Sequence, residues 1–482
     1  MTPPQESPRP TRRSLLAGSA AAAGVLGASF PLAMPAAADT GRGGGVDWPP
    51  GPGQPAKPQQ TDPELRAILR EIDPARIEAT IRKLASFGTR HTLSSQDDPN
   101  RGIGAARDWL FSELQSYAAS SEGRMTVELQ SYIQPVASRI PVPTRITNVM
   151  ATLHGSTSPN RIHVISGHYD SRVTDVMNAT ADAPGADDDA SGVAVSLEIA
   201  RVMATRKPAA TLVFAAVAGE EQGLYGSGHM ATTYKASGAD VRAMFTNDIV
   251  GSSTADDGAK DPFSLRLFAE GVPTSETPAQ AAIRQSVGGE NDSPARQLAR
   301  FVSNVADNDA TGMRVRVIYR RDRYLRGGDH ISFLQQGYSA ARFTEPNENF
   351  AHQHQDVVVR DGVQFGDLPE FCDFDYIARV ARVNAATLWS LSQAPGAPLN
   401  VRILTSVLTN DTALTWTRGP EPDLAGYEVV WRPTDEPDWT TVIPVGSVTS
   451  ATVNLSKDSV FFGVRAVSQS GYRSPVTFPV PL

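Results

Sequence analysis

Apolar runs rich in β-branched residues alternate with helical stretches through the middle of the chain, and this alternation constrains the fold more than any other feature. The runs that predict strands lie at 162–166, 211–217, 241–246 and 339–343. Apolar residues at helical spacing predict helices near 105–117, 191–203 and 376–391. Strands and helices in alternation form a sheet with helices packed on its faces. We therefore predict an α/β fold with a mainly parallel sheet flanked by helices.

The α/β pattern covers residues 61–392, and the composition changes on either side of it. Residues 396–482 contain short alternating strands with turn signals and no helical period, which predicts a C-terminal all-β sandwich. Residues 39–60 are rich in Gly and Pro, so we predict a flexible linker there. Residues 1–38 have the features of an export signal.

The leader carries Arg12 and Arg13 ahead of a stretch rich in Ala, Gly and Leu, and it ends in three alanines at 36–38. Paired arginines at this place resemble a twin-arginine signal, and the alanines offer a cleavage site. A Sec-type signal or an uncleaved anchor is the alternative. Outside the leader no apolar run approaches the roughly 18 residues of a membrane-spanning helix. We therefore expect a secreted protein, exported by the twin-arginine route, with no transmembrane segment in its mature chain.

The charge balance and the cysteine count exclude several classes of protein. The net charge is −8, from 44 Lys and Arg against 52 Asp and Glu, which disfavours nucleic-acid binding as the main function. Cys372 is the only cysteine, so neither an intramolecular disulfide nor a cysteine-based zinc site is possible.

Polar residues gather where the predicted strands end. In chain order they are His168 and Asp170, the run Asp187–Asp188–Asp189, the pair Glu220 and Glu221, and Asp248. Because ligands bind at the carboxyl ends of strands in open α/β sheets, these side chains are expected at one place. Neighbouring carboxylates repel one another, and cations remove that repulsion. Imidazole and carboxylate ligands suit zinc, and less specifically manganese or cobalt. Two ions that share a bridging carboxylate need about five ligands, which this set approaches.

Each of these residues also has a purely structural interpretation. Asp188 or Asp189 could be the N-cap of the helix that follows. Glu220 and Glu221 could be solvated acids favoured by a helix dipole. A lone histidine such as His168 is more often a hydrogen-bonded structural residue than a ligand. Their joint occurrence at successive strand ends favours the metal site.

Four segments carry a specific resemblance to a known family. They are 167–171 (GHYDS), 185–192 (GADDDASG), 219–227 (GEEQGLYGS) and 248–251 (DIVG). In this order they resemble the zinc aminopeptidases of metallopeptidase family twenty-eight, over roughly residues 61–392. The resemblance implies a zinc-peptidase fold, two Zn²⁺ ions and peptide substrates with a free N-terminus.

The resemblance also implies a role for each residue. The zinc ligands would include His168, Asp188, Glu221 and Asp248. Asp188 would bridge the two ions, and Glu220 would be the general base. Asp170 would support His168 and fix the orientation of its ring.

The fifth ligand in that family is a late histidine, usually four residues before an aspartate. His352 lies four residues before Asp356 and is expected to be this ligand, with His354 as a close competitor. Ala351 precedes it where the family often has tyrosine. The segment 328–330 (GDH) resembles a Ser-Asp-His segment near the substrate pocket of the family, and the arginine that often precedes that segment is displaced to Arg326.

The C-terminal segment resembles the end of a fibronectin type III domain in 462–466 (FGVRA), Gly471 and Ser474, with Phe462 where that family has a tyrosine. This domain would bind or space rather than catalyse. It could hold the enzyme near a polymeric substrate or the cell envelope, or it could be a stabilising appendage.

Taken together, the sequence predicts a secreted di-zinc aminopeptidase with Glu220 as general base. Three alternatives stay open. They are another zinc exopeptidase of the carboxypeptidase or dipeptidase type, a glutaminyl cyclase, and a non-catalytic binding homologue. The resemblance implies one zinc for the cyclases, whereas this chain has all five ligand positions.

Overall fold

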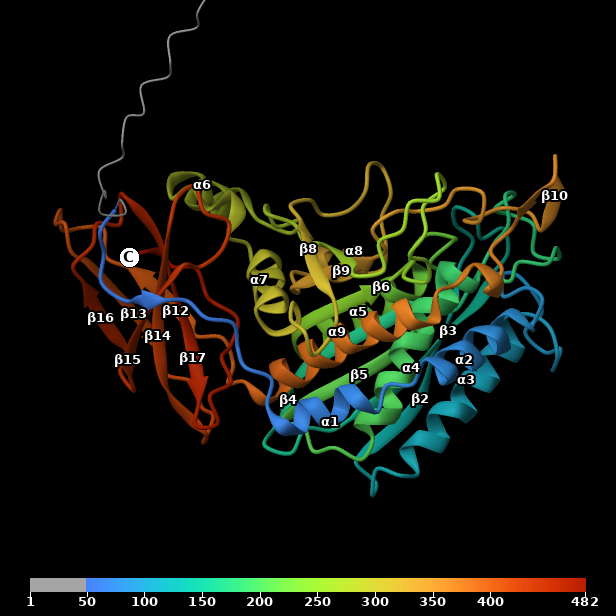
Figure 1. Ribbon diagram of the computed structural model, residues 1–482, viewed down its shortest axis with the longest axis horizontal. Coiled ribbons are helices and arrows are strands. Elements are labelled where there is room, and N and C mark those ends of the chain that lie inside the picture. Colours follow the sequence, from blue (N-terminus) through green and yellow to red (C-terminus); the bar gives the residue numbers. More distant parts are fainter. Residues whose placement is uncertain (1–48) are drawn as a thin grey trace, which may run out of the picture. The chain divides into compact units, whose positions relative to one another are not determined.

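The computed structural model describes residues 49–482, so the predicted export signal and the first part of the predicted linker lie outside the described residues. Its centre is an eight-stranded sheet of order β2-β3-β5-β4-β6-β9-β7-β8 (Figure 1). The strands are β2 (Met125–Gln134), β3 (Thr144–Leu153), β4 (Ser158–His168), β5 (Ala210–Val217), β6 (Asp240–Asn247), β7 (Ser264–Phe268), β8 (Arg314–Ile318) and β9 (Ala340–Thr344).

The predicted α/β class is confirmed, with a sheet that is parallel at its centre and mixed at its edges. Strands β5, β4, β6 and β9 are neighbours and all run parallel. Strands β2 and β3 join one side by antiparallel pairing. On the other side β7 pairs antiparallel with β9 and parallel with β8.

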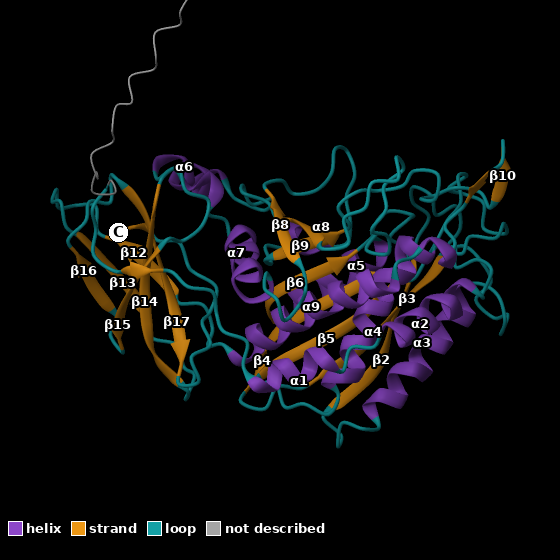
Figure 2. Ribbon diagram, in the orientation of Figure 1, coloured by secondary structure: helices purple, strands orange, loops and turns teal. Residues whose placement is uncertain are grey.

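Helices cover both faces of this sheet (Figure 2). The helices are α1 (Pro63–Arg70), α2 (Pro74–Ala85), α3 (Ile103–Ala118), α4 (Gly192–Met203), α5 (Tyr225–Ser237), α6 (Pro278–Ser286), α7 (Pro294–Ala306), α8 (His330–Gln335) and α9 (Phe374–Gln393). Phe214 of β5 packs in the core formed with α1 to α4 and α9, whereas its neighbour Val213 packs in the core formed with α5 and α8. Successive side chains of a strand point to opposite faces of the sheet. Since helices cover both faces at β5, every residue of this strand is buried.

Several covering helices begin where the sequence places an aspartate cap. Asp62 accepts a hydrogen bond from the Leu65 amide at the start of α1, and Asp373 accepts one from the Tyr376 amide at the start of α9. Pro63 occupies the first position of α1, where its missing amide hydrogen costs nothing.

The C-terminal part forms the predicted all-β sandwich. Its strands are β12 (Leu399–Ile403), β13 (Thr412–Thr417), β14 (Leu424–Pro433), β15 (Thr441–Gly446), β16 (Ser450–Val453), β17 (Val460–Ser468) and β18 (Val480–Pro481). Together with β1 (Gln54–Pro55) from the N-terminal side of the described chain, they make two four-stranded sheets of orders β1-β15-β14-β17 and β16-β13-β12-β18. Trp416 and Tyr427 meet edge to face in the core between them, with ring centroids 5.4 Å apart.

Residues 49–60, which lie in the predicted flexible linker, make specific contacts with the sandwich. β1 (Gln54–Pro55) adds an antiparallel edge strand to β15. The indole nitrogen of Trp431 donates a hydrogen bond of 2.8 Å to the Pro52 carbonyl. At Gly51 an added Cβ would lie 2.7 Å from the Trp431 ring, so the absence of a side chain permits the close approach. The Gly- and Pro-rich composition here serves backbone contact rather than flexibility.

Buried ion pairs join the sandwich to the α/β part. Asp292 lies between Arg300 of α7, at 3.0 Å, and Arg432 of β14, at 2.7 Å. Arg161 of β4 pairs with Glu421 at 2.7 Å. No helix within residues 49–482 is both long and apolar enough to cross a membrane.

Candidate metal centre

The predicted site residues come from the carboxyl ends of neighbouring parallel strands. His168 is the last residue of β4, Asp248 follows β6, and Glu220 and Glu221 follow β5. Asp188 belongs to a short π-helical turn, η1 (Ala186–Ser191), that leads into α4. Because β4 pairs in parallel with both β5 and β6, all these ends open at one edge of the sheet.

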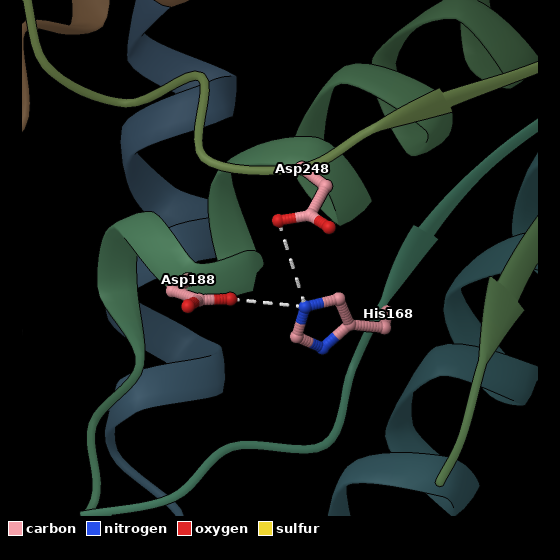
Figure 3. Close-up of side chains that lie close together, drawn as sticks. All are labelled: His168, Asp188 and Asp248. Carbon is pink, nitrogen blue, oxygen red and sulfur yellow. Dashed lines mark ion pairs between the residues drawn. The ribbon is translucent and has the colours of Figure 1, made fainter. Parts of the chain in front are cut away.

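His168, Asp188 and Asp248 form a first cluster of buried ligand atoms (Figure 3). The Nε2 atom of His168 lies 2.9 Å from Oδ1 of Asp188 and 3.9 Å from Oδ1 of Asp248. The other ring nitrogen, Nδ1, lies 3.0 Å from the Asp170 carbonyl, which leaves Nε2 facing the two carboxylates.

Asp188, Glu221 and His354 form a second cluster. The Nε2 atom of His354 lies 2.7 Å from Oδ2 of Asp188 and 2.9 Å from Oε1 of Glu221. Asp188 therefore gives one carboxylate oxygen to each cluster. The contact between His354 and Oε1 of Glu221 is close but lacks hydrogen-bond geometry, so this buried oxygen has no hydrogen-bond partner among the described residues. Unsatisfied carboxylate oxygen and imidazole nitrogen at this spacing fit a divalent metal.

The structure corrects the prediction for the late histidine. His352 is in neither cluster, and its ring stacks on Phe371 with centroids 3.6 Å apart. His354 takes the position instead. Its backbone φ of 54° lies in the left-handed region, so the chain turns sharply between the two histidines. Spacing to Asp356 does not reveal this turn.

The charges of the two clusters shift one another's pKa values. Burial alone would lower the pKa of His354, but Glu221 and Asp188 raise it to about 10. Likewise Asp170 and Asp188 overcome the burial of His168 and raise its pKa well above the usual value. Burial, with the nearby Asp248 and Glu221, raises the pKa of Glu220 well above its usual range. In the absence of a metal ion, the centre therefore binds protons strongly.

Comparison with known proteins shows which family this chain resembles. The sequence profile of peptidase family M28 matches residues 148–360. A probable zinc metalloprotease of Pyrenophora tritici-repentis is 56% identical over 90% of each chain. A probable zinc metalloprotease of Leptosphaeria maculans is 58% identical over 87% of this chain and 97% of its own.

The chain belongs to peptidase family M28.

The crystal structure of Legionella pneumophila LapA has the same fold, with a TM-score of 0.51 and 19% identity over 70% of this chain and 79% of that chain.

In this M28 chain Asp170 contacts the His168 ring at hydrogen-bond distance through its backbone carbonyl, and its carboxylate has a further role. Its two oxygens accept hydrogen bonds from the backbone amides of Glu220 and Glu221, at 3.2 and 3.1 Å. The Thr92 hydroxyl also donates to it, at 3.0 Å. Asp170 thus fixes the turn that carries both glutamates.

Asp189, unlike Asp188, has the structural role that a capping aspartate would have. Its Oδ1 accepts from the Gly192 amide at 3.0 Å, and its Oδ2 accepts from the His168 amide at 2.9 Å. Of the two interpretations that the sequence left open, Asp188 therefore fits the metal ligand and Asp189 fits the structural residue.

Two arginines that the sequence analysis did not single out contact the metal centre of this M28 chain. The fully buried Arg342 of β9 lies 2.8 Å from Oδ1 of Asp248. Arg172 lies 3.0 Å from Oε2 of Glu221 and 2.5 Å from Nδ1 of His354. Arg342 could have been predicted from the sequence, because a charged residue inside the apolar run of β9 is expected to be buried and a buried arginine needs an anionic partner. Arg172 had no comparable signal.

The segment 328–330 lies beside the centre, as expected. A Cβ at Gly328 would come within 2.8 Å of Arg342 and 3.1 Å of Asp248, which explains glycine here. Burial raises the pKa of Asp329 to about 7. Arg326, the displaced arginine, pairs with Glu348 at 2.7 Å and does not contact the ligand set directly.

Proposed function

We propose that this chain is a secreted aminopeptidase that uses two zinc ions to remove residues from the free N-terminus of peptides. The observation that carries the proposal is the division of the Asp188 carboxylate between two ligand clusters, one with His168 and one with His354. A single carboxylate with two histidines on opposite oxygens is the arrangement expected of a bridging ligand.

Zinc is the metal that the ligand chemistry and the relatives support. The chain offers two imidazole nitrogens and three carboxylates, a set that suits zinc. Relatives with more than half of their residues identical are named probable zinc metalloproteases. When bound, zinc would polarise the scissile carbonyl and lower the pKa of a water molecule.

Glu220 is the proposed proton carrier. It follows Gly219 at the end of β5 and belongs to neither ligand cluster. Its raised pKa favours accepting a proton from the attacking water and passing that proton to the leaving amine. Asp170 holds the Glu220 amide and so fixes where this carboxylate starts.

Export and the role of the sandwich belong to the same proposal. The leader at 1–38 supports the twin-arginine route to the outside of the cell. The two sheets of the sandwich support a fibronectin type III-like domain, which would contact a polymer or the cell envelope. Since buried ion pairs fix this domain to the α/β part, surface substitutions test its role better than deletion does.

The experiment is release of N-terminal residues from free and N-acetylated versions of the same peptides. Metal-free protein, zinc add-back and the Glu220→Gln variant serve as controls. Zinc-dependent cleavage of the free peptides alone would support the proposal. Cleavage of acetylated peptides would indicate another peptidase type, and cyclisation of N-terminal glutamine without hydrolysis would indicate a glutaminyl cyclase.

A further inference from the structure

The stretch 314–326 is strongly basic in a chain whose net charge is −8. It contains six arginines and a single acid, Asp322. The stretch comprises β8 and the loop that leads to Gly328 and α8, so it ends beside the metal centre. None of the proposed steps of peptide hydrolysis uses these arginines.

Part of this stretch lines a cavity of about 600 Å³. Its lining includes four arginines and two exposed aromatic residues, namely Arg266, Arg320, Arg323, Arg326, Tyr324 and Phe350. The buried Glu348 neutralises only part of this charge, because Arg266, Arg323 and Arg326 all pair with it, at 3.2, 3.3 and 2.7 Å. The exposed Asp256 and Asp257 also line the cavity, and neither forms an ion pair within the described part of the chain.

Arg320 is the arginine best placed to receive a ligand. Its guanidinium stacks on the Tyr324 ring, 3.5 Å from the centroid. It forms no ion pair with any residue from 49 to 482. Stacking holds the planar group by its face and leaves its N–H donors at the edge, where a carboxylate can bind through two hydrogen bonds.

Two paths of contact connect this cavity to the metal centre. Arg326 lies 3.5 Å from Oε1 of Gln353, and Nε2 of Gln353 lies 3.4 Å from Oδ2 of Asp188. Arg323 and Arg342 both donate to the Gly327 carbonyl, and Arg342 pairs with Asp248. The first path spans at most about 9 Å, which is roughly three residues of extended peptide.

We propose that the cavity around Arg320 and Arg326 binds a carboxylate of the peptide substrate while the scissile bond lies at the metal centre. The proposal rests on the aminopeptidase function proposed above and narrows its substrates to peptides that carry an anionic group a few residues from the bond. That group is the C-terminal carboxylate of a short peptide or an acidic side chain.

The test compares kcat/KM within pairs of peptides that differ by one carboxylate. The first pair is a tripeptide with a free C-terminus and its C-terminal amide. The second pair has Glu or Gln at the third position, and the third pair has Glu or Gln at the first, all amidated. At least one pair should show about a tenfold preference for the carboxylate at low salt, and this preference should shrink in about 0.5 M NaCl. The pair that responds identifies the source of the carboxylate.

Arg320→Gln should bring the ratio of the two kcat/KM values within the responding pair close to one. Arg316→Gln is the matched control, because Arg316 is an exposed arginine of β8 outside the cavity lining, and its ratio should equal that of the unchanged enzyme. Ratios near one for every pair in the unchanged enzyme, or a preference that survives Arg320→Gln, would overturn the carboxylate site.

Calorimetric binding of the same pairs to zinc-loaded Glu220→Gln protein separates the two proposals. Carboxylate-selective binding without any turnover by the unchanged enzyme would overturn the aminopeptidase and keep the site. Turnover by the unchanged enzyme without carboxylate-selective binding would keep the aminopeptidase and overturn the carboxylate site. If the unchanged enzyme shows no turnover and the variant shows no selective binding, both proposals are overturned.

Discussion

Two of the buried clusters of charge within residues 49–482 achieve their balance in opposite ways. At the join between the sandwich and the α/β part, Asp292 is neutralised by Arg300 and Arg432, which keep their charge at any working pH. At the metal centre, Asp188 faces His168 and His354, whose charge depends on bound protons. Protons can be exchanged for a metal ion, whereas guanidinium groups cannot. The first cluster therefore serves stability and the second is prepared for a ligand.

The largest expected effect is on activity, from Glu220→Gln. Burial and neighbouring acids raise the pKa of Glu220, so a neutral amide of the same shape should leave the free energy of unfolding unchanged or slightly increased. Loss of a general base should lower kcat about 10²- to 10⁴-fold. Steady-state kinetics and urea unfolding of the same preparation measure the two effects. A variant that unfolds readily, or that keeps its activity, would remove Glu220 from the proposed role.

Asp292→Ala should show the opposite behaviour. It leaves Arg300 and Arg432 buried without their carboxylate, at an expected cost of about 3–5 kcal/mol in the free energy of unfolding. Trp439 lies against both guanidinium groups and can report the loss by fluorescence. Activity per folded molecule should not change.

The control for this variant is Asp240→Ala. Asp240 also pairs with an arginine, Arg242, but both side chains are about 40% exposed (39% and 42%). Its loss should cost less than about 1 kcal/mol. Equal effects from the two substitutions would contradict the contrast between buried and exposed charge.

Zinc binding should depend on pH because the metal replaces protons at the centre. In the metal-free protein the pKa of His354 is raised to about 10, so its ring is protonated at pH 7, and zinc requires the neutral ring. The apparent affinity should rise about tenfold per pH unit for each proton released, up to about pH 10. The same shift means that the pairing of His354 stabilises the metal-free protein below about pH 6.5 and that this contribution is lost as the pH rises through about 10.

Calorimetry at pH 7 in PIPES and in HEPES measures the released protons, because these buffers bind zinc weakly and differ in ionisation enthalpy. The difference in heat should correspond to at least one proton for each zinc-loaded molecule. Identical heats in the two buffers would show that the histidines are already neutral.

The sequence predicts the parallel centre of the sheet better than its edges. β4, β5, β6 and β9 are buried on both faces, so their apolar runs are continuous and distinctive. The edge strands β2 and β8 alternate exposed or partly exposed residues with more buried ones, because one of their faces meets solvent, and the sequence analysis did not predict them. β7 is largely buried, but it is only five residues long and carries Arg266, so its apolar run is too short to stand out. Gly and Pro in 49–60 were read as flexibility because composition does not show which partner strand a segment will meet.

For the centre, residues carried by strand ends are predictable and residues carried by loops are not. His168, Asp188, Glu221 and Asp248 converge as expected because parallel pairing of β4, β5 and β6 fixes where they lie. His354 and Arg172 come from loops whose course depends on backbone torsions and on contacts far along the chain. No local pattern records those contacts.

The smallest expected effect comes from His352, and it sharpens this contrast between strand ends and loops. His352→Ala removes a ring that stacks on Phe371, so it should cost about 0.5–1.5 kcal/mol in the free energy of unfolding and leave the zinc content unchanged. His354→Ala is its matched partner two residues away, and it removes a ligand atom 2.7 Å from Asp188. That variant should lose one zinc of the proposed two and most of the activity. Metal analysis of the two purified proteins decides the assignment, because loss of zinc from His352→Ala with retention in His354→Ala would return the fifth ligand to the residue that spacing predicted.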